Sequence, residues 1–419
     1  MENSRNYRIW IDKSHTFDSG LNTGIQRVVR NLATHVPPIA NEAGIPCSTV
    51  LLRENAFQDL ENYQTRWGAT SFRTWKRSTR YRRTNYIPAK VYFGIKQLVQ
   101  LANRSKSVRM QAMDWLILPD GYWAMNGIWK HVQQARNDGV RVCAVLYDLI
   151  PVLNPEFFPA RSQAGFVAYL ERMMSDVDLV MCISKTVEQD YRRYVDQQRM
   201  KTGITHKQTI ASFRLGADLP NCSAQDSLLQ PRSESLLPQD DVPFFLQVGT
   251  IEPRKNHSII LDAVEKLWLR GVNVRCVFVG RSGWMADALL LRIATHSECN
   301  SRLFHFASLD DFALTDLYRK CHAVLCPSLA EGFGLPIVEG LFAGKRVIAS
   351  DIPIHREVGQ DACLYFDVHH LAALEQLMEE CLSPFGGMNE TEIGRFASWS
   401  RAITTWRNSA AELLSHIMS

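Results

Sequence analysis

Short apolar runs alternate along the chain with longer segments in which apolar residues recur at helical spacing. Residues 7–11 form one such run, and after a polar loop Ile25, Val28, Val29 and Leu32 follow the i, i+3, i+4, i+7 pattern. This predicts a strand followed by an amphipathic helix. Further apolar runs occur at 115–118, 142–146, 179–183, 244–248, 275–279, 323–325 and 347–349. Short strands of this kind, separated by helices, indicate parallel sheets of the α/β class.

A change of composition divides the chain in two. Residues 220–243 are rich in Ser, Gln, Asp and Pro and lack a sustained period, which is typical of a linker between domains. We therefore expect one α/β domain over 1–219, a second over 244–394, and a packed C-terminal helix over 395–419. Because ligands bind beyond the carboxyl ends of parallel strands, two facing domains would form an interdomain cleft that holds the chemistry.

The composition is that of a globular protein in a reducing compartment. Of 419 residues, 46% are hydrophobic and 21% are charged, and no apolar run is long enough to span a bilayer. Residues 1–13 mix charged and polar side chains where a signal peptide would be apolar. The ten cysteines are scattered and form no CxxC pair, which argues against zinc and disulfides and favours the cytoplasm.

The charge is unevenly distributed, although the net charge is only +4. Residues 66–109 contain twelve Lys or Arg and no Asp or Glu, so the rest of the chain carries a net charge of −8. Interleaved aromatic residues make an anionic membrane surface the favoured partner, with the protein peripheral on the inner face of the membrane. A solvated basic insertion without a partner is the alternative. Nucleic acid would also attract these cations, but none of the usual nucleic-acid-binding modules is visible, and we expect no such partner.

The most specific signal lies in residues 327–340. The glycines of this stretch let the backbone approach a ligand closely, and Pro336 suits the first position of a helix, where free amides point at an anion or hydroxyl. Glu331 and Glu339 lie eight positions apart across this turn. A single acidic residue in the first turn of a helix is common, because it compensates the helix dipole. Two glutamates at this spacing across a glycine-rich turn are much rarer. We therefore predict a site for a polar ligand here.

Together with residues 248–256, this motif resembles the retaining glycosyltransferases of family 4. The resemblance implies the GT-B fold, in which two Rossmann-like domains face each other, the first binding the acceptor and the second the nucleotide sugar. It also implies that Glu331 contacts the donor sugar, that Glu339 contacts the nucleoside ribose, and that Arg254 and Lys255 hold the donor diphosphate. A guanidinium fork and an ammonium can neutralise a leaving diphosphate without a metal ion.

The same resemblance implies further donor contacts. Residues 23–29 resemble the family's glycine loop, in which the Gly24 amide approaches the diphosphate from the N-terminal domain. Leu309 lies at the start of the stretch that borders the base, although Ala307 stands where a glycine is typical. The remaining predicted donor-binding residues are Gly249, Gly332, Phe333, Gly334 and Leu335.

The acceptor side is defined by three candidates. Residues 147–151 resemble a family motif that more often reads His-Asp-Leu-Ile-Pro, and Tyr147 replaces the histidine that is implied to lie beside the donor sugar. Together with Arg254, Lys255 and Glu331, Asp148 is predicted to be catalytic, as a contact to acceptor or sugar. Its alternative role is a cap of the strand end. Tyr147 and Asp120 are predicted on the acceptor side.

A second acidic pair does not support a metal site. Asp176 and Asp178 have the Asp-x-Asp spacing that binds metal in the other main glycosyltransferase fold, but there the carboxylates follow a strand, whereas these precede an apolar run. We interpret them as helix-end and turn residues. No metal and no other cofactor is therefore predicted.

These features predict transfer of a hexose from a GDP- or UDP-sugar to a hydroxyl of a glycan or lipid-linked acceptor, with retention at the anomeric carbon. Similarity to mannosyltransferases of bacterial surface-polysaccharide assembly makes GDP-mannose the first donor to consider. No motif supplies the carboxylate pair of a retaining glycosidase, so a front-face displacement is expected. The alternatives are a sugar-nucleotide epimerase or phosphorylase on the same scaffold, and a non-catalytic nucleotide-sugar-binding protein.

Overall fold

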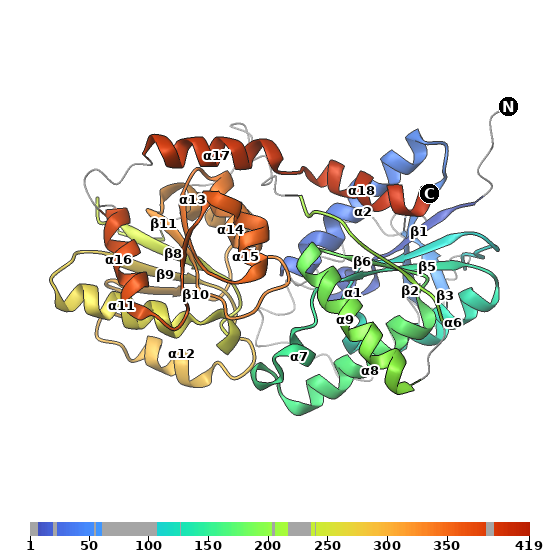
Figure 1. Ribbon diagram of the computed structural model, residues 1–419, viewed down its shortest axis with the longest axis horizontal. Helices are drawn as coiled ribbons and strands as arrows, with labels where there is room; N and C mark the ends of the chain where they lie inside the picture. The colour runs from blue at the N-terminus through green and yellow to red at the C-terminus, as the bar shows by residue number, and fades with distance from the viewer. Residues whose placement is uncertain are drawn as a thin grey trace, which may run out of the picture.

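The computed structural model describes residues 7–19, 23–53, 56–60, 107–125, 127–202, 206–216, 236–238, 240–382 and 389–419. Within them the chain forms two lobes, each built on one sheet (Figure 1). The basic segment 66–109 and the predicted linker 220–243 lie largely outside the described residues. Both therefore stay predictions from the sequence.

The N-terminal lobe is organised around a sheet whose described strands follow the order β3-β2-β1-β4-β5-β6-β7. The strands are β1 (Ile9–Asp12), β2 (Cys47–Arg53), β3 (Ala56–Asp59), β4 (Trp115–Leu118), β5 (Arg141–Leu146), β6 (Leu179–Cys182) and β7 (Thr209–Ser212). Neighbouring strands are parallel except β2 and β3, which are antiparallel. Every residue of β1, β4 and β6 is buried, as expected for a parallel sheet covered on both faces.

Helices and short 3-10 turns connect these strands. They are α1 (Ser14–Ser19), α2 (Gly24–Glu42), η1 (Tyr122–Ala124), α6 (Ile128–Asn137), α7 (Ile150–Leu153), η2 (Pro155–Phe157), α8 (Ala160–Asp176) and α9 (Lys185–Thr202). In α2, Val28, Val29 and Leu32 are buried and Ile25 packs against the same core. The helix predicted from this periodicity is therefore confirmed, and its apolar face covers the sheet.

The C-terminal lobe has a parallel sheet in the order β10-β9-β8-β11-β12-β13. Its strands are β8 (Phe244–Val248), β9 (Arg275–Val279), β10 (Leu303–Phe306), β11 (Ala323–Cys326), β12 (Arg346–Ser350) and β13 (Leu364–Phe366). Its helices and turns are η3 (Pro253–Lys255), α11 (His257–Leu269), α12 (Asp287–Ala294), α13 (Asp311–Lys320), α14 (Leu335–Phe342), α15 (Pro353–Gly359), η4 (Gln360–Ala362) and α16 (Leu371–Leu382). Phe245 joins one core cluster, and its neighbours Phe244 and Leu246 join another, so both faces of this sheet are covered.

The end of the chain forms two helices where the sequence predicts one over 395–419. Helices α17 (Glu390–Ala402) and α18 (Trp406–Met418) are separated by extended backbone, and Thr405 caps the second. Trp399 packs in a core cluster of the C-terminal lobe, whereas Trp406 packs in the N-terminal core. Figure 1 shows α17 along the C-terminal lobe and α18 beside α2. The single helix is therefore wrong, because the chain crosses back to the first lobe.

The two chain segments that join the lobes touch each other. Gly216 is the last described residue before the predicted linker, and a Cβ at this position would lie 2.3 Å from the Trp406 nitrogen. Only a glycine permits this approach. Arg214 Nε strengthens the contact by donating to Glu412 Oε2 at 3.3 Å. The outgoing and returning segments are thus held together at one place.

Three smaller predictions concern the described residues. Asp176 ends α8 and Asp178 precedes β6, where its Oδ2 accepts a hydrogen bond from the Val142 amide at 2.8 Å, so their interpretation as helix-end and turn residues is confirmed. The nine cysteines within the described ranges are free thiols. Among the helices of these ranges, none is both long enough and apolar enough to cross a bilayer.

Candidate active site

The two predicted phosphate-binding cations follow strand β8. Arg254 and Lys255 lie on η3, whose backbone is fixed because Gln247 Nε2 donates to the Lys255 carbonyl at 2.9 Å and the Leu329 amide donates to the Arg254 carbonyl at 2.7 Å. Strands β8 and β11 are neighbours and parallel, so their following loops meet at the same edge of the sheet. This arrangement places both cations beside the loop after β11.

Glu331, in that loop, is the carboxylate that both cations share. Arg254 Nη1 lies 3.0 Å from Glu331 Oε2 and 3.1 Å from the Ala330 carbonyl oxygen. Lys255 Nζ pairs with Glu331 Oε1. Arg254 Nη2 lies 2.6 Å from Glu252 Oε1. The structure therefore brings three of the predicted catalytic residues into direct contact.

The charges of this cluster are strongly coupled. Burial would raise the pKa of Glu331, but Lys255 and Arg254 outweigh it and hold that pKa well below its usual range. Burial also opposes the charge of Arg254, yet Glu331, Glu252 and Asp148 outweigh it and raise the pKa of the guanidinium. Asp148 behaves differently, because burial raises its pKa more than Arg254 lowers it. The site thus combines fixed charges with one carboxyl that accepts a proton more readily.

The loop between β11 and α14 touches the N-terminal lobe. A Cβ on Gly332 would lie 2.0 Å from the Tyr147 carbonyl oxygen, so only glycine lets the two backbones come this close. The Ser184 hydroxyl donates to the Gly332 carbonyl at 3.1 Å, and Phe333 packs against the cores of both lobes. Gly334 has φ of 93° directly before α14, a left-handed conformation that favours glycine. The predicted donor loop therefore forms part of the contact between the lobes.

The start of α14 also faces the start of α2. A Cβ on Gly24 would lie 3.3 Å from Leu335 Cδ1, which places the two predicted donor-binding residues side by side. One turn further along α14, Glu339 is buried, accepts a hydrogen bond from the Tyr318 hydroxyl at 2.6 Å, and forms an ion pair with Arg27 of α2. The positive ends of both helix dipoles consequently lie at this contact.

A third contact between the lobes comes from α15. The Glu357 carboxylate accepts hydrogen bonds from the Lys185 amide at 2.7 Å, the Thr186 amide at 2.8 Å and the Thr186 hydroxyl at 2.6 Å. These amides begin α9, where an acidic side chain compensates the helix dipole. The carboxyl edges of the two sheets thus face each other around the predicted site.

Gly249 and Leu309 lie along the same edge of the C-terminal sheet. The loops after β8 and β9 are in close contact, since a Cβ on Gly280 would lie 1.8 Å from the Gly249 carbonyl oxygen. Leu309 is partly buried in the loop after β10, next to Asp310, which caps α13. The sheet order β11, β8, β9, β10 leads from Glu331 through the cations to Leu309. The residues expected to contact the donor sugar, the diphosphate and the base therefore lie along one edge of the sheet in that order.

Tyr147 and Asp148 lie opposite, where β5 ends. Tyr147 is buried, and its hydroxyl donates to the Pro119 carbonyl at 2.5 Å, so its ring is fixed inside the N-terminal lobe. Asp148 Oδ1 accepts a hydrogen bond from the Ile150 amide at 3.0 Å, which is the capping role considered as its alternative. A Cβ on Gly332 would lie 3.2 Å from Asp148 Cβ, so Asp148 lies beside the loop that carries Glu331 in the other lobe.

Asp120 is fully buried and holds neighbouring groups in place. Its carboxylate accepts hydrogen bonds from the Thr16 amide at 2.8 Å, the Thr16 hydroxyl at 2.6 Å and the Gly121 amide at 2.8 Å. His15 Nδ1 lies 3.1 Å from Asp120 Oδ1, and the His15 side chain is 30% exposed. Of this pair, His15 is therefore the residue that reaches the surface.

Sequence reasoning missed three residues that the structure adds to the site region. Glu252 holds Arg254, Arg27 pairs with Glu339, and His15 accompanies Asp120. Glu252 carries the clearest signal, because it lies within residues 248–256, the segment that resembles the family, two positions before Arg254. The other two lie on α1 and α2, where local spacing does not reveal a partner in a distant segment.

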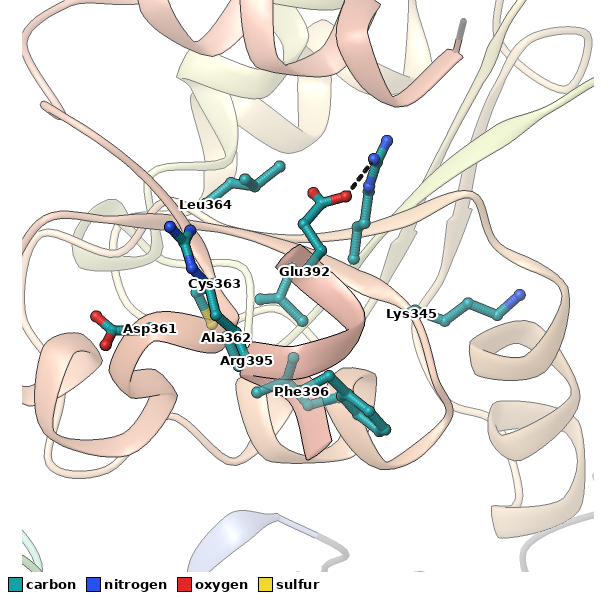
Figure 2. A pocket seen from close by; sticks show the side chains of 11 residues that line it. Lys345, Asp361, Ala362, Cys363, Leu364, Glu392, Arg395 and Phe396 are labelled. Atoms are coloured by element: carbon teal, nitrogen blue, oxygen red, sulfur yellow. Dashed lines mark hydrogen bonds and ion pairs between the residues drawn. The ribbon is translucent and has the colours of Figure 1, made fainter. Parts of the chain in front are cut away.

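Within the described residues, the site shows no metal-binding cluster, and the pocket drawn in Figure 2 lies elsewhere. Over the described ranges, no group of three His, Cys, Asp or Glu is placed to hold a metal ion. A shallow pocket lies at the amino end of β12, between that strand and α17 (Figure 2). Arg346 Nη2 donates there to Glu392 Oε2 at 2.6 Å. None of the predicted site residues is among those that line this pocket.

Residues 231–383 match the family model described as Glycosyl transferases group 1. The matched range contains strands β8 to β13 together with Arg254, Lys255, Glu331 and Glu339. This part of the C-terminal half is therefore similar to group 1 glycosyltransferases.

Two of the relatives with similar sequences are mannosyltransferases. The chain is homologous to the serotype-specific mannosyltransferase WbdA of Escherichia coli, at 30% identity over 287 residues that cover 68% of this chain and 34% of that protein. It is also similar to the O-antigen chain mannosyltransferase RfbU of Salmonella typhimurium, at 22% identity over 267 residues that cover 63% of this chain and 69% of that protein. The chain thus spans about a third of the length of WbdA.

Solved structures agree on the fold. Anabaena HepE in complex with UDP and glucose superposes with a TM-score of 0.62 at 14% identity, covering 98% of this chain and 100% of that chain. Sucrose-phosphate synthase from Thermosynechococcus elongatus gives a TM-score of 0.59 at 15% identity, covering 98% of each chain. The predicted GT-B arrangement of two Rossmann-like domains is confirmed.

Proposed function

We propose that the chain is a retaining, metal-independent glycosyltransferase that moves a hexose from a nucleotide diphosphate sugar to a hydroxyl of a glycan or lipid-linked acceptor. The observation that carries the proposal is the contact of Arg254, Lys255 and Glu331 beside the N-terminal lobe. The names of the relatives support mannose as the sugar, GDP-mannose as the first donor to test, and polysaccharide or lipopolysaccharide assembly as the setting.

In this proposal Arg254 and Lys255 hold the diphosphate and stabilise the charge that develops as the bond between sugar and phosphate breaks. Glu331 orients both cations in the structure and stays ionised because of its low pKa. Sugar hydroxyls donating to Glu331 would leave the guanidinium and the ammonium available to the phosphate oxygens. The Gly24 amide would approach the same phosphates from the other lobe.

Retention requires the acceptor to enter on the face from which the phosphate leaves. The departing phosphate oxygen then takes the acceptor proton, and no separate base is needed. Asp148 is the candidate to contact the acceptor hydroxyl or the sugar, because it lies near Arg254 and has a raised pKa. Glu339 is assigned to the ribose and Leu309 to the base.

The proposed location is the inner face of the membrane. A lipid-linked acceptor is presented at that surface, and the twelve cations of residues 66–109 would be attracted to its anionic lipids. The protein would then be a peripheral membrane enzyme on the cytoplasmic side.

The test is incubation of the chain with GDP-mannose or UDP-glucose and a lipid-linked glycan, followed by chromatography. A lengthened glycan supports transfer. An altered donor without a lengthened glycan would instead indicate an epimerase or phosphorylase, and donor binding without any product a binding protein. The anomeric configuration of the product, read by NMR, tests retention. If EDTA stops turnover and added Mg²⁺ or Mn²⁺ restores it, the enzyme depends on a metal ion and this part of the proposal is wrong.

A further inference from the structure

Arg27 links the two lobes at the candidate site. It lies in the first turn of α2, where its amide donates to the Thr23 carbonyl at 3.0 Å, and its guanidinium pairs with Glu339 of α14. The side chain of Glu339 is 6% exposed and that of Arg27 is 24% exposed, so solvent screens this ion pair weakly. Arg27 thus reaches a carboxylate that belongs to the predicted donor site.

Glu339 cannot keep this partner and bind a ribose in the same way. The Tyr318 hydroxyl holds Glu339 Oε2 at 2.6 Å, and Arg27 pairs with Oε1. Ribose hydroxyls that bind Oε1 would therefore compete with Arg27 for the carboxylate. A partly buried guanidinium that loses its anion is costly unless it finds another. The anion that arrives with a ribose is the phosphate joined to it through C5′.

We propose that Arg27 is a third cation of the donor site, which exchanges Glu339 for the diphosphate when a nucleotide binds. This inference rests on the proposed function. Gly24 lies one helical turn earlier and is the backbone contact assigned to the same phosphates, so Arg27 is within reach of them. Its planar guanidinium can donate two hydrogen bonds to phosphate oxygens. The diphosphate is then neutralised by Arg254 and Lys255 from one lobe and by Arg27 from the other.

The test is calorimetric titration of the full chain with GDP and with UDP. Arg27→Gln removes the positive charge. The glutamine amide can still donate a hydrogen bond to Glu339, so the buried carboxylate keeps a partner and the fold is preserved. We expect this variant to weaken binding of the preferred nucleotide roughly tenfold or more, and to make the affinity less sensitive to salt. Arg27→Lys should recover part of the affinity. Arg407→Ala is the matched control, because Arg407 pairs with Glu42 near the other end of α2, and it should bind as the wild type does.

The outcomes separate this inference from the proposed function. If the wild-type chain binds neither nucleotide, the proposed function is wrong, and the inference about Arg27 is wrong as well. If the wild type binds and Arg27→Gln binds equally well, Arg27 only joins the lobes, and the inference alone is overturned. Tighter binding by Arg27→Gln also overturns it, because Arg27 would then merely compete with the ribose for Glu339.

Discussion

Replacing Gly332 by alanine should disable transfer without unfolding the protein. The new Cβ would lie 2.0 Å from the Tyr147 carbonyl oxygen, whereas a close C···O contact is about 3.3 Å. The obstacle is backbone of the opposite lobe, so no side-chain rotation relieves it, and the lobes must separate by roughly 1 Å. A displacement of about 1 Å between reacting groups costs on the order of a hundredfold in rate. This corresponds to about 2.7 kcal/mol of transition-state stabilisation.

The assay is the rate of glycan lengthening at saturating donor, with thermal melting to verify the fold. Melting should change little, because the new methyl group meets a backbone oxygen between the lobes and removes no side chain from either core. Gly394→Ala is the matched control: nothing lies within 4 Å of a Cβ there, and the residue is inside α17. We expect it to keep full activity and to gain about 0.5–1 kcal/mol of stability. A folded Gly332→Ala protein with at least half the wild-type rate would refute the reasoning, since the lobes would not need this approach.

Three further predictions address charge. Lys255→Ala and Glu331→Ala should each abolish most transfer while circular dichroism stays close to that of the wild type; near-normal rates in either variant would remove that residue from the site. Burial, with a smaller contribution from Asp120, raises the pKa of Asp12 to about 6. Its stabilising contribution is therefore complete below pH 4 and lost as the pH rises through 6. Denaturant unfolding should show the wild type losing about 2 kcal/mol of stability relative to Asp12→Asn between pH 4 and 7. If the stabilities of the two proteins change in parallel with pH, ionisation of Asp12 does not destabilise the fold. Neutralising the four arginines of residues 77–83 should reduce flotation with anionic liposomes, most at low salt; unchanged flotation would exclude this segment as the membrane contact.

The cluster around Glu331 was predictable because its members lie in short segments at strand ends. Arg254 and Lys255 follow one predicted strand, and Glu331 follows another. Parallel strands bring such loops to one edge of a sheet whatever the rest of the chain does. The sequence therefore determines the proximity of these residues even without knowledge of the side-chain contacts.

Contacts between the lobes were not predictable in the same way. Arg27 sits on the polar side of an amphipathic helix, where an arginine ordinarily faces solvent. Its pairing with Glu339 depends on how the lobes are oriented, and no local period encodes that orientation. The burial of Asp120 was equally unpredictable from the sequence. Only the fold reveals that its carboxylate is enclosed by α1 and that His15 is exposed in its place.

The two terminal helices show how a continuous pattern can mislead. Phe396, Trp399, Ile403 and Trp406 keep helical spacing through the break between α17 and α18. Trp399 packs in the core of the C-terminal lobe and Trp406 in the core of the N-terminal lobe. Both positions are therefore apolar, and the helical spacing continues although the helix is interrupted. The available signal was Thr405, whose side chain accepts a hydrogen bond from the Asn408 amide as an N-cap does.

The return of α18 to the first lobe bears on how this protein is made. Trp406, Leu413 and Leu414 complete a core whose other members are synthesised some two hundred residues earlier. Domains commonly fold one after another during translation, beginning at the amino end. Here the part of the first domain's core that α18 covers can be buried only after α18 leaves the ribosome.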